Sequence, residues 1–304
     1  MAITAGMVKE LREKTGAGMM DCKKALTEAE GNMDRAIDIL REKGLSQAAK
    51  KSDRIAAEGL VGMMISEDGK KAAMTEVNSE TDFVAKNEEF QTFVANVTKV
   101  AMEKEPKDLE ELLASEYSAG VTVEAELTTK IAKIGENMNV RRFSALSIEA
   151  GRISGYVHGA GKIAVLVKLE AASDSEKLDE LGKDIAMQVA AMNPKYISRD
   201  DVDQDYINHE REILIQQALN EGKPQNIVEK MVEGRLQKQL KEVCLLEQTF
   251  VKDSDKAVKD VVADTAKALG VEIKVVAVER FEVGEGLEKK SENFAEEVAK
   301  QLGN

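Results

Sequence analysis

Two related stretches decide the fold: GKKAAMTEVNSETD at residues 69–82 and GKIAVLVKLEAASD at residues 161–174. Each follows a short apolar segment, GLVGMMIS at 59–66 or SGYVHG at 154–159, and a glycine-containing turn, EDG or GAG. Short apolar runs bounded by turn residues are typical of hairpin strands. The chain is therefore predicted to contain two copies of one β-hairpin.

The repeat continues beyond the hairpins. The same offset of 92 residues pairs FVANVTKV at 93–100 with IAMQVAAM at 185–192, and both predict a helix. Later, GENMNVRRFSAL at 135–146 pairs with GVEIKVVAVERF at 270–281 at an offset of 135, and both predict a returning strand. This pattern predicts a duplicated α+β core in which helices pack on small antiparallel sheets.

The offset between the two copies grows from 92 to 135 residues, which predicts an insertion of about 43 residues in the second copy. Extra helices between the paired elements would account for it. Two charged helical runs at 199–221 and 225–243, joined by GKP, match that length. They predict a protruding antiparallel helical hairpin with a thin apolar seam. The seam is predicted from Val202, Tyr206, His209 and Ile213 on one helix and Val228, Met231, Val232, Leu236 and Leu240 on the other.

The first forty residues predict a three-helix bundle. Three apolar stripes at helical spacing lie in residues 4–44, Thr4 can cap the first helix, and glycines at 16, 18, 31 and 44 mark the breaks. Residues 46–56 are interpreted as a tether. The predicted units are 1–54, a three-helix docking module; 55–150, the first repeat; 151–195 with 244–283, the second repeat; 196–243, the hairpin; and 284–304, a C-terminal module with a helix at Ser291–Leu302.

Charge and composition narrow the function. The formal net charge is −13, although residues 1–54 hold 11 Lys and Arg against 9 Asp and Glu. An acidic chain argues against direct nucleic-acid binding. Two distant cysteines fit a reducing compartment, and no apolar run reaches membrane length, so a cytoplasmic protein without membrane contact is expected.

Enzymatic signals are weak. Gly159-Ala-Gly161 matches part of a dinucleotide fingerprint, but a strand pattern follows it where that fingerprint requires a helix. The two histidines, His158 and His209, do not form a metal site with two distant cysteines. A non-enzymatic protein that needs no cofactor or metal is expected.

Two apolar features remain open to two interpretations. Met19 continues a predicted buried stripe through Cys22, whereas Met20 lies about 100° off it, either as ordinary helix surface or as an adaptable contact for a partner. Phe83 lies one heptad before Phe90 of a predicted helical stripe, and also at a strand–helix junction. It is therefore either a core residue or a side chain presented to another protein.

Six segments closely resemble the elongation factor Ts family: LREKTGAGMMDCKKAL, EVNSETDFVAKNEEF, KIGENMNVRRF, GYVHGAG, GKPQNIVEKMVEGR and RFEVGEGLEK. They span nearly the whole chain. The position after Asn78 is often Cys in the family and is Ser79 here.

The resemblance implies a protein that binds the GTPase elongation factor Tu, loosens GDP and Mg²⁺, and holds the nucleotide-free form. It implies that Asp82 and Phe83, within the TDFV motif formed by Thr81 to Val84, enter the GTPase near its magnesium site. Met19, Met20 and His158 are implied as further contacts, although His158 is equally interpretable as a turn residue bonded within its own sheet. A homodimer is also compatible with the hairpin.

Two other functions stay in view. The N-terminal bundle resembles ubiquitin-associated (UBA) modules, which suggests a general adaptor. An enzyme with an unrecognised carboxylate site would turn over a substrate without any partner.

Overall fold

The computed structural model describes residues 3–288, and the predicted helix Ser291–Leu302 lies outside them. The described chain begins with the predicted bundle of α1 (Ala5–Thr15), α2 (Met19–Glu28) and α3 (Met33–Ala49). Thr4 caps α1, because its hydroxyl accepts the backbone N–H of Met7 at 3.3 Å. The bundle has its own small core of Val8, Leu11, Cys22, Ala25, Leu26, Ala29, Ala36 and Ile39.

The predicted helix end at Gly44 is wrong. Helix α3 continues to Ala49 and packs on α7 (Val123–Ile134). A Cβ atom built at Gly44 would lie 3.8 Å from the Cβ of Ala132, so Gly44 lies at the contact between the two helices. Contact with a distant helix thus outweighs the cost of about 1 kcal/mol that glycine imposes inside a helix. Residues 46–49 accordingly belong to the helix rather than to a tether.

Both halves of the core contain the same antiparallel three-stranded sheet. The first has the order β1 (Glu58–Ile65), β2 (Lys71–Ser79) and β5 (Met138–Ser147). The second has the order β6 (Gly151–His158), β7 (Ile163–Ala171) and β10 (Ile273–Glu282). In each sheet the late strand returns beside the second strand of the hairpin, as the sequence repeat predicts, so the α+β class is confirmed.

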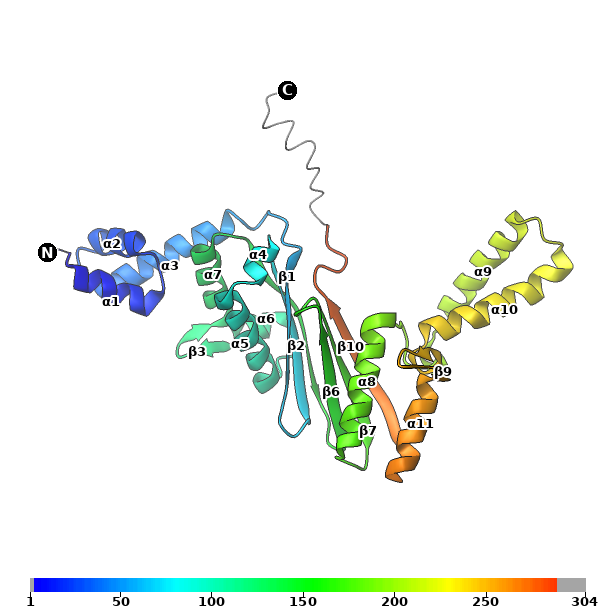
Figure 1. The fold of residues 1–304 in the computed structure, drawn as a ribbon. Coiled ribbons are helices and arrows are strands. Elements are labelled where there is room, and N and C mark those ends of the chain that lie inside the picture. The colour runs from blue at the N-terminus through cyan, green and yellow to red at the C-terminus, as the bar shows by residue number, and fades with distance from the viewer. Residues whose placement is uncertain (1–2, 289–304) are drawn as a thin grey trace.

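The core has four layers (Figure 1). Helix α5 (Glu88–Lys104) covers the outer face of the first sheet, and α8 (Glu176–Met192) covers the second. The inner faces pack on each other through Val61, Ala72, Met74, Ile153, Ala164, Leu166, Phe281 and Val283. Because β7 is buried on both faces, it is an almost continuous apolar run without hydrophobic–polar alternation.

The connections between the helix and the returning strand show where the insertion lies. The first copy contains α6 (Leu109–Ala114), β3 (Glu116–Ser118), β4 (Val121–Thr122) and α7. The second contains η1 (Arg199–Asp201), α9 (Gln204–Asn220), α10 (Gln225–Val243), η2 (Leu245–Glu247), β8 (Thr249–Phe250), β9 (Asp253–Ala257) and α11 (Val258–Leu269). The β8–β9–α11 unit repeats β3–β4–α7, so α9 and α10 are the added elements.

Helices α9 and α10 form an antiparallel pair that projects from the core (Figure 1). Arg235 pairs with Glu221 at 2.9 Å, and Gln239 donates to Glu210 at 2.5 Å, so residue numbers fall on one helix as they rise on the other. The seam is buried at Ala218, Val228, Val232, Leu236 and Leu240.

The predicted α9 stripe is partly wrong, because His209 and Ile213 are exposed and Leu214 and Ile215 pack on the seam instead. The face of α9 that packs on α10 is thus formed by Leu214, Ile215 and Ala218.

We expect the hairpin to be removable. Its ends are adjacent, since the backbone N–H of Tyr196 donates to the carbonyl of Val243 at 3.1 Å. Replacing residues 198–242 by a short glycine linker should therefore leave cooperative thermal unfolding, followed by circular dichroism, intact. The matched control removes residues 116–134 from the first copy, which should abolish cooperative unfolding because Val123 and Ile131 are core residues. Loss of cooperativity in the hairpin variant would contradict the insertion.

Candidate partner-binding site around Phe83

Phe83 is presented by a single turn of helix between β2 and α5. This Phe83 turn (residues 80–86) contains α4 (Asp82–Ala85), whose N-cap is Thr81. Val84 and Ala85 are buried on its inner side, whereas the Phe83 side chain is 79% exposed. The interpretation of Phe83 as a core residue is therefore wrong. Its separation from Phe90 explains this: Asn87 caps a new helix, so the two phenylalanines do not share one helical stripe.

Asp82 is held as a charged group beside Phe83. Its carboxylate lies 2.6 Å from the Lys86 ammonium. The hydrogen bond from Lys86, together with the nearby charge of Lys162, keeps the pKa of the Asp82 carboxyl below its usual value. The Lys86 ammonium also lies 5.9 Å from the centre of the Phe83 ring. The turn thus presents an aromatic ring and a carboxylate together.

His158 lies at the end of β6, where the turn between β6 and β7 contacts β1. The carbonyl of Gly161 accepts the backbone N–H of Val61 at 2.8 Å, and Lys162 pairs with Glu58 at 2.6 Å. His158 is exposed, and its Nδ1 lies 3.0 Å from the Tyr156 hydroxyl. Since α4 also packs on β1, the structure places the Phe83 turn and the His158 hairpin around the same strand.

Met19 and Met20 lie on a different element, at the start of α2, and are 54% and 63% exposed. The prediction that Met19 belongs to the buried stripe is wrong, because the buried residues of α2 begin at Cys22. Gly18 is the N-cap, so both methionines occupy the first turn of the helix. The bundle therefore carries a second exposed apolar site, separate from the Phe83 turn (Figure 1).

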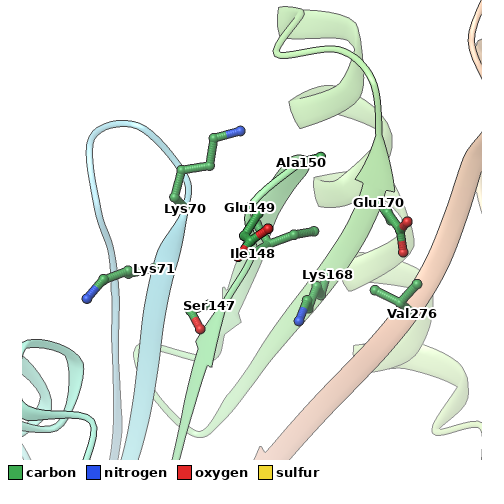
Figure 2. Close-up of a pocket in the computed structure, with 9 residues that line it drawn as sticks. All are labelled: Lys70, Lys71, Ser147, Ile148, Glu149, Ala150, Lys168, Glu170 and Val276. Atoms are coloured by element: carbon green, nitrogen blue, oxygen red, sulfur yellow. The ribbon is translucent and has the colours of Figure 1, made fainter.

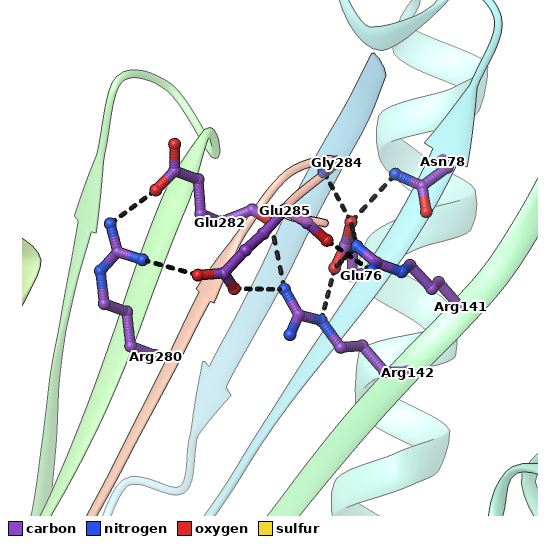
Figure 3. Close-up of polar contacts among 8 residues, drawn as sticks. All are labelled: Glu76, Asn78, Arg141, Arg142, Arg280, Glu282, Gly284 and Glu285. Atoms are coloured by element: carbon purple, nitrogen blue, oxygen red, sulfur yellow. Dashed lines mark hydrogen bonds and ion pairs between the residues drawn. The ribbon is translucent and has the colours of Figure 1, made fainter. Parts of the chain in front are cut away.

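A buried ionic network around Glu76, which no sequence motif predicts, lies at the end of β2 that leads into the Phe83 turn (Figure 3). The Glu76 side chain in β2 is fully buried and accepts hydrogen bonds from the Gly284 N–H at 2.8 Å, Asn78 at 3.0 Å, Arg141 at 3.0 Å and Arg142 at 2.6 Å. Burial alone would raise the pKa of Glu76, but these hydrogen bonds together outweigh it and keep the pKa below its usual value.

The same network joins the two halves of the core. The Arg142 guanidinium stacks 4.4 Å from the centre of the Phe281 ring and donates to the carbonyl of Glu282 at 3.1 Å. Glu285 lies 3.2 Å from Arg142, and Arg280 pairs with Glu282 at 2.6 Å. The arginines of β5 thus bind the segment that follows β10. Only the folded chain brings these residues together, which is why no local motif identifies them.

A cavity of about 610 Å³ opens between the two sheets at the opposite end of β2 (Figure 2). It is lined by Lys70, Lys71, Ser147, Ile148, Glu149, Ala150, Lys168, Glu170 and Val276. Lys70 is engaged with Asp174 and the carbonyl of Gly151, and Lys71 with Glu105. The cavity is therefore lined by both positively and negatively charged side chains. Among these lining residues no nucleophile is paired with a base, so the lining does not indicate a catalytic site.

Among residues 3–288 there is no cluster of three or more His, Cys, Asp or Glu side chains suited to a metal ion. Within the same range, no helix has both the length and the apolar character required to cross a membrane.

Comparison with known proteins places these features in a family. The family described as "Elongation factor TS" matches residues 80–285, from the first residue of the Phe83 turn to Glu285. Elongation factor Ts of Clostridioides difficile is 63% identical over 300 residues, covering 99% of each chain. The Clostridium novyi and Clostridium botulinum proteins of that name are 57% and 55% identical over similar lengths. The chain belongs to the elongation factor Ts family.

Proposed function

We propose that this chain is a guanine nucleotide exchange factor that binds elongation factor Tu, promotes release of GDP and Mg²⁺, and stabilises the nucleotide-free GTPase. The observation that carries the proposal is the 79% exposure of Phe83 on a turn whose next two residues, Val84 and Ala85, are buried. A large aromatic side chain exposed in this way is suited to enter a pocket on another protein.

In this proposal Asp82 and Phe83 act as one device. Phe83 enters the GTPase and displaces elements that hold the nucleotide, while the adjacent charge of Asp82 disturbs the groups around magnesium and phosphate. Thr81 and Val84 hold the turn from its two sides, through the cap and through core packing. Met19 and Met20 provide a flexible apolar contact. His158 contributes a polar contact beside β1, the strand on which the Phe83 turn packs.

Affinity arithmetic explains why such a factor is useful. A GTPase that binds GDP at roughly nanomolar affinity, loading at about 10⁶ M⁻¹s⁻¹, releases it at about 10⁻³ s⁻¹. A thousandfold acceleration requires only about 4 kcal/mol of barrier reduction. Burying one exposed phenylalanine supplies about 1.5–3 kcal/mol of this, and further contacts supply the rest. Linkage requires that nucleotide and exchange factor weaken each other's binding by the same factor.

The N-terminal bundle and the α9–α10 hairpin support the exchange function. The N-terminal bundle, interpreted as a UBA-like docking module, carries Met19 and Met20 to the GTPase. The α9–α10 hairpin is an accessory element suited to self-association. The test of the function is the rate of fluorescent GDP release from elongation factor Tu, which this chain should accelerate without consuming any substrate.

A further inference from the structure

The loop between α7 and β5 (residues 135–137) is hydrogen-bonded to the Phe83 turn. Within this loop, the Glu136 carboxylate accepts the backbone N–H of Thr81 at 3.0 Å and the Thr81 hydroxyl at 2.8 Å. The same hydroxyl accepts the backbone N–H of Val84 at 3.4 Å. A chain of hydrogen bonds therefore runs from Glu136 through Thr81 to Val84, the residue that follows Phe83.

The neighbouring residue, Asn137, holds the segment that arrives from the bundle. Its side-chain amide donates to the carbonyls of Arg54 at 2.7 Å and Ser52 at 3.3 Å. Its backbone N–H donates to the Glu80 carboxylate at 2.6 Å, and Arg54 lies 3.4 Å from the same carboxylate. Asn137 is buried, so the hydrogen bonds that it makes itself are partly shielded from water. Consecutive residues of one loop thus anchor both the Phe83 turn and the connection to α3.

Rigidity of this kind matters for a protruding aromatic. Helix α4 has only four residues, and a helix this short has no stability of its own in water. Phe83 contributes little to holding the turn, because its side chain is exposed and makes no part of the buried core cluster beside it. A turn that had to become ordered on docking would lose part of the binding free energy that Phe83 provides. The Glu136 carboxylate, half-buried beneath the turn, removes this cost by fixing the turn in advance.

We propose that Glu136 is a positioning residue for nucleotide exchange: it holds the Phe83 turn in the docking conformation through Thr81, and Asn137 couples this turn to the bundle. The inference rests on the proposed function. It adds a residue that need not touch the GTPase and acts only through Phe83.

The principal variant is Glu136→Ala. It should slow GDP release from elongation factor Tu by about tenfold relative to the parent chain, since small misplacements of a positioned group have effects of this order or larger. The matched control is Asp201→Ala. Asp201 makes the same two hydrogen bonds to Ser198, at 2.7 and 2.8 Å, at the foot of the hairpin. Its loss should leave the exchange rate unchanged.

A mutant cycle separates positioning from general stability. In a Phe83→Ala background, Glu136→Ala should change the rate by less than about twofold, because a residue that acts through Phe83 has nothing left to position. Equal slowing in both backgrounds would overturn the proposal, as would a folded Glu136→Ala variant with the parental rate. Should Glu136→Ala fail to fold, Glu136→Gln keeps the side-chain volume and one acceptor oxygen. Slowing to an intermediate rate is then expected, and the parental rate would again overturn the proposal.

Hydrogen exchange of the free protein tests the same inference without the GTPase. The Val84 amide should lose protection in Glu136→Ala, while amides of α8 keep theirs. Unchanged protection at Val84 would overturn the positioning role. If the parent chain fails to accelerate GDP release from elongation factor Tu but Val84 protection falls as expected in Glu136→Ala, the exchange function is wrong and the support of the turn by Glu136 stands.

Discussion

Replacing Phe83 by alanine should leave the melting temperature nearly unchanged and slow GDP release from elongation factor Tu by about ten- to a hundredfold. The small effect on stability follows from exposure, since surface substitutions of this kind change the free energy of unfolding by less than about 0.5 kcal/mol. The large kinetic effect follows from the loss of the 1.5–3 kcal/mol, approximately, that burial of the ring in a partner provides. Differential scanning calorimetry and stopped-flow fluorescence measure the two quantities.

The comparison with Phe90 makes this prediction sharper. Phe90 is fully buried in the first repeat, so Phe90→Ala should cost about 3–5 kcal/mol of unfolding free energy. Asp82→Ala should show a milder kinetic loss than Phe83→Ala, because its ion pair with Lys86 is exposed and contributes little to the fold. Losses smaller than additive in the double variant would show that the two residues act together. A Phe83→Ala protein that melts several degrees lower would contradict presentation of the ring to a partner.

Replacing Glu76 by alanine should lower the free energy of unfolding by about 3–5 kcal/mol, because removal of one partner leaves buried donors and two arginines without their acceptor. The N–H of Gly284 and the amide of Asn78 lose the same carboxylate. Chemical denaturation measures the difference. Glu89→Ala is the matched control: Glu89 also binds two lysines at 2.8 Å, but 29% of its side chain is exposed whereas Glu76 is fully buried, so its removal should cost clearly less than that of Glu76. Equal effects of the two substitutions would contradict the structural role of the buried network.

The pH dependence of this network has a defined sign. Because the folded state lowers the pKa of Glu76, its stabilising contribution is fully present above the ordinary glutamate pKa of about 4.3 and is lost as the pH falls through the lower folded-state value. The difference in unfolding free energy between the parent and Glu76→Gln should therefore shrink as the pH decreases below about 4.3. A difference that stays constant between pH 7 and pH 3 would show that Glu76 does not titrate in this way.

Local and repeated signals account for the parts of the fold that the sequence predicts. The paired hairpins, the returning strands and the added helices all appear as repeats or as changes of offset between repeats. Thr4 caps α1 as predicted, because capping depends on residues three positions apart. The buried stripe of α5, from Phe90 to Ala101, follows helical periodicity for the same reason.

Distant contacts account for what the sequence leaves open or predicts wrongly. In the sequence Gly44 resembles a helix end. In the folded chain α7, about eighty residues later, packs against it, and the helix continues. Glu76 is one acidic residue among 56 Asp and Glu, and apart from Asn78 its partners lie on two distant segments, β5 and the residues that follow β10. Glu136 is likewise indistinguishable from a surface carboxylate until the fold places it under Thr81. For Phe83, periodicity alone left two interpretations, and the caps at Thr81 and Asn87 decide between them.

The exchange function itself is tested most directly by the release of fluorescent GDP from elongation factor Tu in the presence of excess unlabelled GDP. With increasing concentration of this chain, the release rate should rise from about 10⁻³ s⁻¹ by about a thousandfold and then saturate, as expected for a factor that binds the nucleotide-bound GTPase and lowers the barrier to release. In the absence of nucleotide the GTPase should remain bound to the chain, and added GDP should dissociate that complex. A release rate that stays at its intrinsic value at saturating concentrations of the folded chain would contradict the proposed function.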